Sequence, residues 1–379
     1  MKQFIVLLLS TLFMISCHKE KLNRNPLQVA LASELPAIKR VMDSLKKHEI
    51  QIKYTQIDRK NDSVVFADFE FQVNAKHYFY PASTVKFPVA VLSLEKVNTL
   101  EGFDMNTRFY VEGDTLETTI AKEISKIFAV SDNEAYNRLF EFLGQDAIHR
   151  NLTERGITNV RISHRVSTPN SDDITTKPLI VYLNDSTTKV REKIINATIQ
   201  PLTLEGIKKG IAYYDEEEVL LQEPFDFSLK NYYPIEAQHE VLKRIIFPEN
   251  FPKKQQFDLT KTQRDFLLKA MHTLPKELGY ASDTYYDSYV KFFMFGDTQQ
   301  AIPSTVEIYN KVGYAYGTLT DCAYIKDTEN QVDFLVTATV LVNENKTFND
   351  NTYEYDSIGI PFLAELGRVL YQQELQRKK

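Results

Sequence analysis

Ser83 and Lys86 carry the side chains in this sequence that are best suited to nucleophilic chemistry. They form a Ser-x-x-Lys pattern at the start of a predicted apolar helix, so the hydroxyl and the amine share one face about a turn apart. For Lys86 to act as the base of Ser83, its pKa must fall from about 10.4 to about 7–8. The helix N-terminus adds free N–H groups for a developing oxyanion. A capping serine with a surface lysine is the alternative, because the pattern also begins at Ser44 and Ser186.

Ser131-Asp132-Asn133 occurs only once and lies between two predicted helices, so we expect a loop directed into a cleft. A Ser hydroxyl can relay a proton, and an Asn side chain can bind an amide as both donor and acceptor. The alternative is that Ser131 or Asp132 caps the helix that begins near Asn133.

Lys311-Val312-Gly313 follows a strand-like run at residues 304–310. Gly313 would let a substrate backbone approach the edge of that strand, and Lys311 could hold a substrate carboxylate. The alternative is an ordinary hairpin strand with a surface lysine.

Hydrophobic periodicity predicts the elements that must position these groups. Helices are predicted at residues 27–47 (started or interrupted at Pro36), 84–96, 118–128, 133–143, 259–274 and 357–376. Strands are predicted at residues 50–58, 63–74, 306–316, 321–326 and 332–343, the first two joined by a turn at 59–62. A mostly helical middle enclosed by strands and helices predicts an α+β fold with an inserted helical subdomain at about 84–300.

The composition excludes several classes of protein. Lys+Arg 45 against Asp+Glu 51 gives a net charge of -6, which leaves no basic excess for a nucleic-acid partner. The 43% hydrophobic and 25% charged residues are typical of a folded globular chain. Cys17 and Cys322 are too few for a disulfide framework or a multi-cysteine metal site. We therefore expect neither a metal nor a cofactor.

The first 16 residues are predicted to be a signal peptide. A short positive start precedes an apolar run at residues 4–15, which is too short to span a bilayer comfortably. The small residue Ser16 before Cys17 resembles the end of a bacterial lipobox. This resemblance implies cleavage before Cys17 and lipidation of that cysteine. The alternative is a plain signal peptide. Residues 17–27 would then be a polar tether to the membrane of the cell envelope, in the periplasm or at the outer membrane. Cys322 would be the only thiol, buried in a strand.

Together, the three motifs resemble the set S-x-x-K, S-D-N and K-T-G shared by class A β-lactamases and penicillin-binding proteins, in the same chain order. The stretch KVGYAYGTLTDCAYI resembles the class A segment from K-T-G through Y-G-T to an Asp, and SDNEAYNRLF resembles the family's SDN helix start. The chain is identified as a member over residues 28–379, with residues 171–255 poorly matched. This resemblance implies an antiparallel sheet flanked by helices, with an inserted all-α subdomain.

The resemblance also implies roles for individual residues. Ser83 would be the acylated nucleophile, Lys86 its base or proton relay, and Ser131 the group that passes the proton to the leaving nitrogen. Substrate binding would involve Asn133, Lys311, Gly313 and Tyr314. The N–H groups of Ser83 and Tyr314 would form the oxyanion hole.

The sequence departs from the family pattern at two places. Val312 stands where a hydroxyl residue would help bind the substrate carboxylate. Residues 160–170 contain no carboxylate where class A enzymes carry the Glu that activates the deacylating water, and Ser167 falls near its place. Asp172 and Asp173 are the nearest acids. His164 is a further candidate base, and the alternative is a loop histidine that caps backbone groups.

Three functions remain open from the sequence. The first is a class A-like serine hydrolase that opens the β-lactam amide through a Ser83 ester. The second is a slowly deacylating D-Ala-D-Ala peptidase or penicillin-binding relative that acts on peptidoglycan peptides, which the missing Glu favours. The third is a non-catalytic envelope protein that binds through residues 171–255, where an acidic run lies at 215–218.

Overall fold

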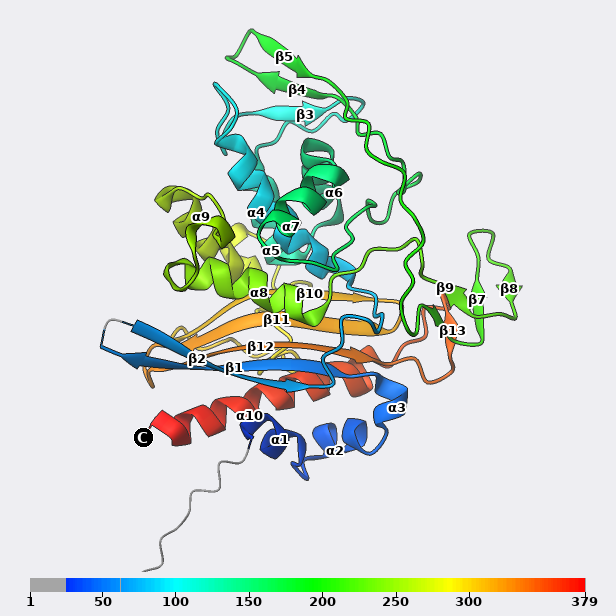
Figure 1. The fold of residues 1–379 in the computed structure, drawn as a ribbon, viewed down its shortest axis with the longest axis vertical. Helices are drawn as coiled ribbons and strands as arrows, with labels where there is room; N and C mark the ends of the chain where they lie inside the picture. The colour runs from blue at the N-terminus through cyan, green and yellow to red at the C-terminus, as the bar shows by residue number, and fades with distance from the viewer. Residues whose placement is uncertain (1–24, 62, 379) are drawn as a thin grey trace, which may run out of the picture.

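The computed structural model describes residues 25–61 and 63–378. The predicted signal peptide, Cys17 and most of the predicted tether lie outside the described residues. Figure 1 shows a central sheet with a layer of helices on each face. Among the residues described, no helix is long and apolar enough to cross a membrane.

The central sheet confirms the predicted α+β fold. Its strands are β1 (Gln51–Lys60), β2 (Ser63–Phe71), β10 (Val306–Ala315), β11 (Thr318–Asp327) and β12 (Val332–Leu341). The order β10-β11-β12-β1-β2 is antiparallel throughout, with Gln51 opposite Thr339 where the first strand meets the last. β10 is therefore an edge strand, and Cys322 of β11 is a free, buried thiol as predicted.

One face of the sheet is covered by elements from both ends of the chain (Figure 1). These are α1 (Pro26–Leu31), α2 (Pro36–Met42), α3 (Leu45–His48) and α10 (Ile360–Lys378), the last preceded by a π-helical turn at Tyr355–Gly359. The segment predicted as one helix is thus three short ones, because Pro36 begins the second and left-handed Glu49 ends the third. Apolar side chains of these helices and of the sheet form one core cluster.

The opposite face carries the helical layer. Its members are α4 (Lys86–Val97), α5 (Ile120–Val130), α6 (Asn133–Leu143), α7 (Gln145–Glu154), α8 (Ile235–Ile246) and α9 (Lys261–His272). Four of them match predicted helices within a few residues, whereas α7 and α8 were not predicted. α8 lies against the sheet, where His239 is hydrogen-bonded to Thr55 and Thr337.

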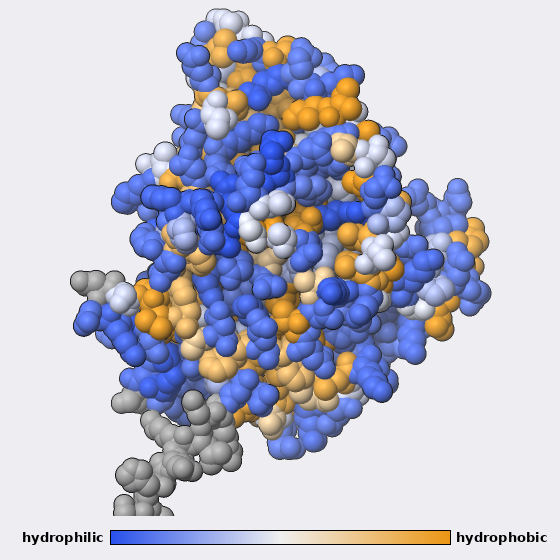
Figure 2. Space-filling view, in the orientation of Figure 1, coloured by the Kyte–Doolittle hydropathy of each residue, from blue (hydrophilic) through white to orange (hydrophobic). Residues whose placement is uncertain are grey.

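The inserted region also contains short strands that periodicity did not predict. A small sheet at the top of Figure 1 holds β3 (Phe109–Val111), β4 (Leu179–Tyr182) and β5 (Thr188–Arg191). A lateral projection holds β6 (Lys208–Lys209), β7 (Ala212–Tyr214), β8 (Leu220–Leu221) and β9 (Phe225–Asp226). β13 (Thr347–Phe348), from outside the inserted region, pairs with β7 there. Figure 2 shows this projection as largely hydrophilic, with apolar side chains at its outer edge. Most of these strands fall in the poorly matched segment 171–255.

Candidate active site

Ser83 lies in a tight turn directly before a buried helix. A 3-10 turn at Ala82–Val85 leads into α4, whose first residue is Lys86, and Ala82 adopts a left-handed φ of 46°. Thr84 Oγ1 donates a 2.7 Å hydrogen bond to Pro81 O, which fixes the turn. A left-handed alanine is an uncommon conformation that surrounding structure must hold in place. The half-buried Ser83 is therefore presented on a constrained backbone.

Lys86 is fully buried and reaches the second motif. Its Nζ donates hydrogen bonds of 2.6 Å to Asn133 Oδ1 and 2.5 Å to Ser131 O, and lies 3.5 Å from Ser131 Oγ. Burial lowers the pKa of Lys86 to about 7, against the opposing effect of the Asp132 carboxylate. This is the range that a lysine base needs, so the surface-lysine alternative does not apply to Lys86.

The second motif is both a helix cap and part of the site. Asp132 caps α6, because its Oδ1 accepts a 2.8 Å hydrogen bond from Ala135 N. Ser131 has a left-handed φ of 58° at the end of α5, and Asn133 opens α6. The cap thus fixes the loop that turns Ser131 and Asn133 toward Lys86.

Lys311 approaches Ser131 from the sheet. Its Nζ, at the end of a buried side chain, donates 2.8 Å hydrogen bonds to Ser131 Oγ and to Val312 O. Burial, reinforced by the Lys86 charge, holds the pKa of Lys311 well below its usual range. The Ser131 hydroxyl therefore lies between two buried lysines.

Gly313 brings the edge strand β10 close to Ser83, and Tyr314 follows it on the same strand. A Cβ on Gly313 would lie 2.7 Å from Ser83 N and 2.8 Å from Pro81 O, so only glycine fits this approach. Tyr316 and Gly317 have φ of 51° and 69°, as in a two-residue hairpin turn. The alternation of an antiparallel ladder then directs the Tyr314 N–H away from β11, toward the free edge beside Ser83.

A buried polar network lies next to Lys311 in the sequence of β10 and includes Lys291, which sequence reasoning missed, and Asp321, the Asp of the matched stretch. Lys291 Nζ donates 2.7 Å hydrogen bonds to Asn310 Oδ1 and Met271 O, and Asn310 Nδ2 donates to Asp321 Oδ1 at 2.9 Å. Burial lowers the pKa of Lys291 to about 7 and raises the pKa of Asp321 to about 6. Lys291 lies in an irregular segment without a motif, so no local signal marked it.

A cavity of about 450 Å³ opens in front of Ser83. Its lining includes Asn133 and Ser167 on one side and Tyr314 on the other. Further tyrosines also line it: Tyr80, Tyr316, Tyr353 and Tyr355. Of the residues described, those lining the cavity include the cations Arg165 and Lys230 but no Asp or Glu. Across residues 25–61 and 63–378, no three metal-ligating side chains form a cluster.

Of the candidate deacylating groups, some line the cavity and others do not. Ser167 Oγ accepts a 3.0 Å hydrogen bond from Asn133 Nδ2, so it lies at the site as predicted. Asp172 and Asp173 are exposed and do not line the cavity. His164 does line it, but Nδ1 donates to Arg165 O at 2.6 Å and Nε2 accepts from Asn231 N at 3.0 Å. Both nitrogens are thus engaged, and burial lowers the pKa of His164 to about 4.

The loop that carries Ser167 is anchored by buried polar contacts. Arg165 forms a buried ion pair with Glu141, with nitrogen–oxygen distances of 2.5 and 2.9 Å. Asn137 exchanges hydrogen bonds of 2.9 and 3.0 Å with the backbone of Val166. Val312 is buried in the sheet core, so an apolar side chain stands at the position where the family carries a hydroxyl residue.

A model of the beta-lactamase enzyme family matches residues 36–199, a segment that includes Ser83, Lys86, Ser131 and Asn133. Over this segment the chain is similar to the beta-lactamase enzyme family. No protein of curated function matches the chain.

Solved structures share the fold at low sequence identity. PBP-A superposes with a TM-score of 0.53 at 14% identity, over 94% of this chain and 97% of that chain. A beta-lactamase from Sphaerobacter thermophilus DSM 20745 gives 0.51 at 12% identity, and one from Desulfarculus baarsii DSM 2075 gives 0.51 at 14%. Both beta-lactamase matches cover 92% of this chain and 96% of the other. The described fold is thus that of beta-lactamases and PBP-A.

Proposed function

We propose that this protein is a serine acyl-enzyme that opens the amide bond of β-lactams through Ser83 and releases the product slowly. The single observation that carries the proposal is the buried Lys86, whose pKa lies at about 7 and whose Nζ is hydrogen-bonded to the second motif beside the nucleophile turn. A lysine in this state can accept a proton near neutral pH, which a solvated surface lysine cannot.

Acylation begins when the Ser83 proton passes to Lys86 Nζ and Ser83 Oγ bonds to the amide carbonyl carbon. The N–H groups of Ser83 and Tyr314 stabilise the oxyanion that forms. When the carbon–nitrogen bond breaks, the leaving nitrogen takes a proton from Ser131 Oγ, and Lys86 Nζ, 3.5 Å from that oxygen, returns the Ser83 proton to it. Lys311, whose Nζ lies 2.8 Å from Ser131 Oγ, supports the transfer. Asn133 binds the substrate amide, and Gly313 leaves room for the substrate along β10.

Slow release follows from the residues around the ester. Hydrolysis needs a base to activate water, and the described lining of the cavity offers the Ser167 hydroxyl but no carboxylate. This favours the penicillin-binding peptidase relative over an efficient β-lactamase, with peptidoglycan peptides as the natural substrate. A point mutant of PBP-A, which shares the fold at 14% identity, is described as an acyl-enzyme complex with penicillin G. We further propose that lipidation of Cys17 anchors the protein in the bacterial cell envelope.

The test is to incubate the protein with a penicillin and a chromogenic cephalosporin and to follow both intact mass and hydrolysis. An adduct that outlasts many minutes without comparable turnover supports the proposed function. Rapid turnover that Ser83→Ala abolishes would instead establish the efficient β-lactamase. If neither an adduct nor turnover is detected, the non-catalytic binding protein is the remaining function.

A further inference from the structure

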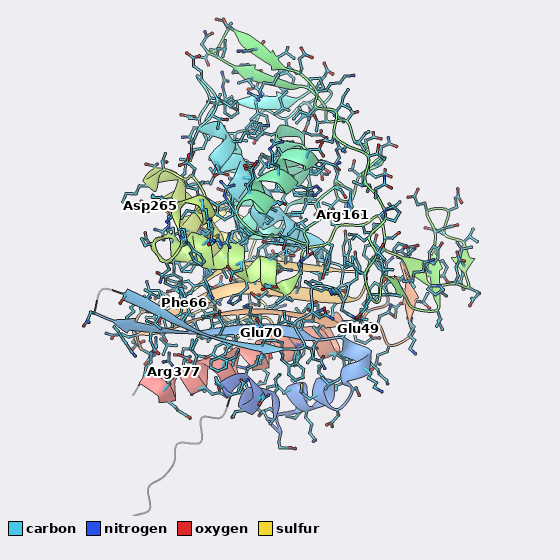
Figure 3. The ribbon with its side chains drawn as sticks, viewed as in Figure 1. Glu49, Phe66, Glu70, Arg161, Asp265 and Arg377 are labelled. Atoms are coloured by element: carbon cyan, nitrogen blue, oxygen red, sulfur yellow. The ribbon has the colours of Figure 1, made fainter. Side chains whose placement is uncertain are left out.

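A second cavity, of about 700 Å³, lies between three chain segments that are distant in sequence. It is bounded by α3, by residues 206–211 of the lateral projection and by residues 341–348 at the end of β12. Figure 3 places Glu49, one of its lining residues, at the α3 end of the sheet, on the side of the projection. Ser83 does not line this cavity, so it is distinct from the candidate active site.

Each of the three segments supplies lysine to the cavity lining. The lysines are Lys46, Lys47, Lys208, Lys209 and Lys346. Such a cluster is unexpected in a chain of net charge -6, because the average surface is acidic. It therefore gives the cavity a local positive field that the whole molecule does not have.

The acidic groups of the cavity are already engaged by other cations. Glu49 pairs with buried Lys209 and with His77, the latter at 3.2 Å, and Glu344 lies 3.8 Å from Arg40. In addition, Lys208 is 3.5 Å from Asp226.

Three cavity lysines remain without such a neighbour. In the part of the chain that the structure describes, the ammonium groups of Lys46, Lys47 and Lys346 have no carboxylate within 4.0 Å. All three side chains belong to exposed residues. Among the described residues, these three ammonium groups thus form no ion pair and are accessible to a ligand.

Hydrogen bonds and an ion pair link the chain segments that form the walls of the cavity. Ile211 N donates a 3.0 Å hydrogen bond to Lys346 O, and Gly210, at φ 76°, lies so close that a Cβ would come within 2.5 Å of the same oxygen. The ion pair of buried Lys209 with half-buried Glu49 links the projection to the C-terminal end of α3. The chain segments that carry the lysines are therefore fixed around a preformed space.

We propose that this cavity binds a multiply charged phosphate compound. Lysine ammonium groups are point-charge donors suited to phosphate oxygens. The three lysines without an ion-pair partner, two on α3 and one on the segment after β12, match several phosphate charges rather than one carboxylate. The volume far exceeds that of inorganic phosphate, and the apolar side chains of Ile211 and Phe348 in the lining suit a non-polar portion of the ligand. Free oligophosphates and phospholipid head groups share this chemistry.

Binding experiments separate these two sources. Tripolyphosphate is titrated into the protein in a calorimeter. Sedimentation is measured with vesicles of cardiolipin, whose head group carries two phosphates, and phosphatidylcholine against vesicles of phosphatidylcholine alone. Saturable binding of tripolyphosphate identifies a free phosphate ligand. Binding confined to the anionic vesicles identifies a lipid head group. Binding of neither overturns the proposal.

Substitutions then locate the site. Combined Lys46→Gln, Lys47→Gln and Lys346→Gln should weaken binding by about tenfold or more, because each removes a charge-assisted hydrogen bond. Lys122→Gln, Lys253→Gln and Lys254→Gln make the same charge change outside the cavity and should leave binding within about twofold. Equal weakening in the two triple variants would show non-specific attraction and overturn the proposal. Lys346→Gln alone gives the same comparison against Lys122→Gln if the triple variant does not fold.

Discussion

Asn133 Nδ2 donates a 3.0 Å hydrogen bond to Ser167 Oγ, and the same Asn133 accepts one of 2.6 Å from Lys86 Nζ through its Oδ1. One amide thus joins the candidate base to the loop in which class A enzymes place their deacylating Glu. The loop is held at the site, but it presents a hydroxyl instead of a carboxylate.

Ser167→Glu is expected to speed deacylation. A carboxylate at this position lies beside Asn133 and can activate a water, a contribution typically worth about 10²-fold or more. The measurement is the lifetime of the penicillin adduct by time-resolved intact mass. Ser167→Gln is the matched control, since it has nearly the same size without the basic oxygen. Equal adduct lifetimes for the two variants would show that the loop does not reach the ester.

The rate of acylation is expected to rise with pH through about 7 and to level above it. The reason is the sign of the Lys86 shift: burial lowers its pKa to about 7, so the neutral base is lost as pH falls below that value. Stopped-flow labelling with a fluorescent penicillin between pH 5.5 and 9 measures the profile. Lys86→Arg keeps the charge but cannot deprotonate, so it should remove the labelling. A rate that falls between pH 6 and 8 would contradict Lys86 as the base.

Lys86→Met is expected to make the protein more stable near pH 7 and to change how stability depends on pH. The unfolded chain keeps the Lys86 proton up to its ordinary pKa of about 10.4, whereas the folded protein loses it near 7, so this group adds stability as pH rises across that window. Its removal should lower the slope of unfolding free energy by about 1.4 kcal/mol per pH unit there. Urea denaturation at pH 7, 8, 9 and 10 tests this, and parallel curves for the two proteins would refute a depressed pKa.

Gly313→Ala is expected to slow acylation by about 10²-fold, because displacement of the strand by an ångström misplaces the oxyanion donors. The added Cβ would meet Ser83 N at 2.7 Å and Pro81 O at 2.8 Å, both backbone atoms that cannot swing aside. Gly156→Ala is the control for a backbone strained without a clash, since Gly156 has a left-handed φ of 76° and its Cβ would meet nothing within 4 Å. Equal labelling rates for both variants would show that the close approach of β10 does not hold Ser83 in position for acylation.

Much of the site was predictable because its motifs begin or end regular elements. Ser83 and Lys86 start a helix, Ser131 and Asn133 flank a helix cap, and Lys311 sits on an alternating strand, so local patterns placed each one. Lys311 Nζ lies 2.8 Å from Ser131 Oγ in the fold. Only the family resemblance predicted that these two residues share a site, because no local pattern encodes a distance between segments so far apart in the sequence.

What the sequence did not reveal depends on contacts between distant segments. Lys291 lies in an irregular stretch, and only the fold shows it bonded to Asn310. The short strands of residues 171–255 have two to four residues each, too few to generate a periodic signal. The lysines of the second cavity are ordinary surface charges until three segments bring them together.

The central claim is that Ser83 becomes an ester, and the most direct measurement is peptide mapping of the protein after brief exposure to penicillin. We predict one modified peptide containing Ser83, with the mass increase of the intact drug, and no such peptide in Ser83→Ala. An unmodified Ser83 peptide at saturating penicillin, or the same adduct in Ser83→Ala, would contradict the mechanism.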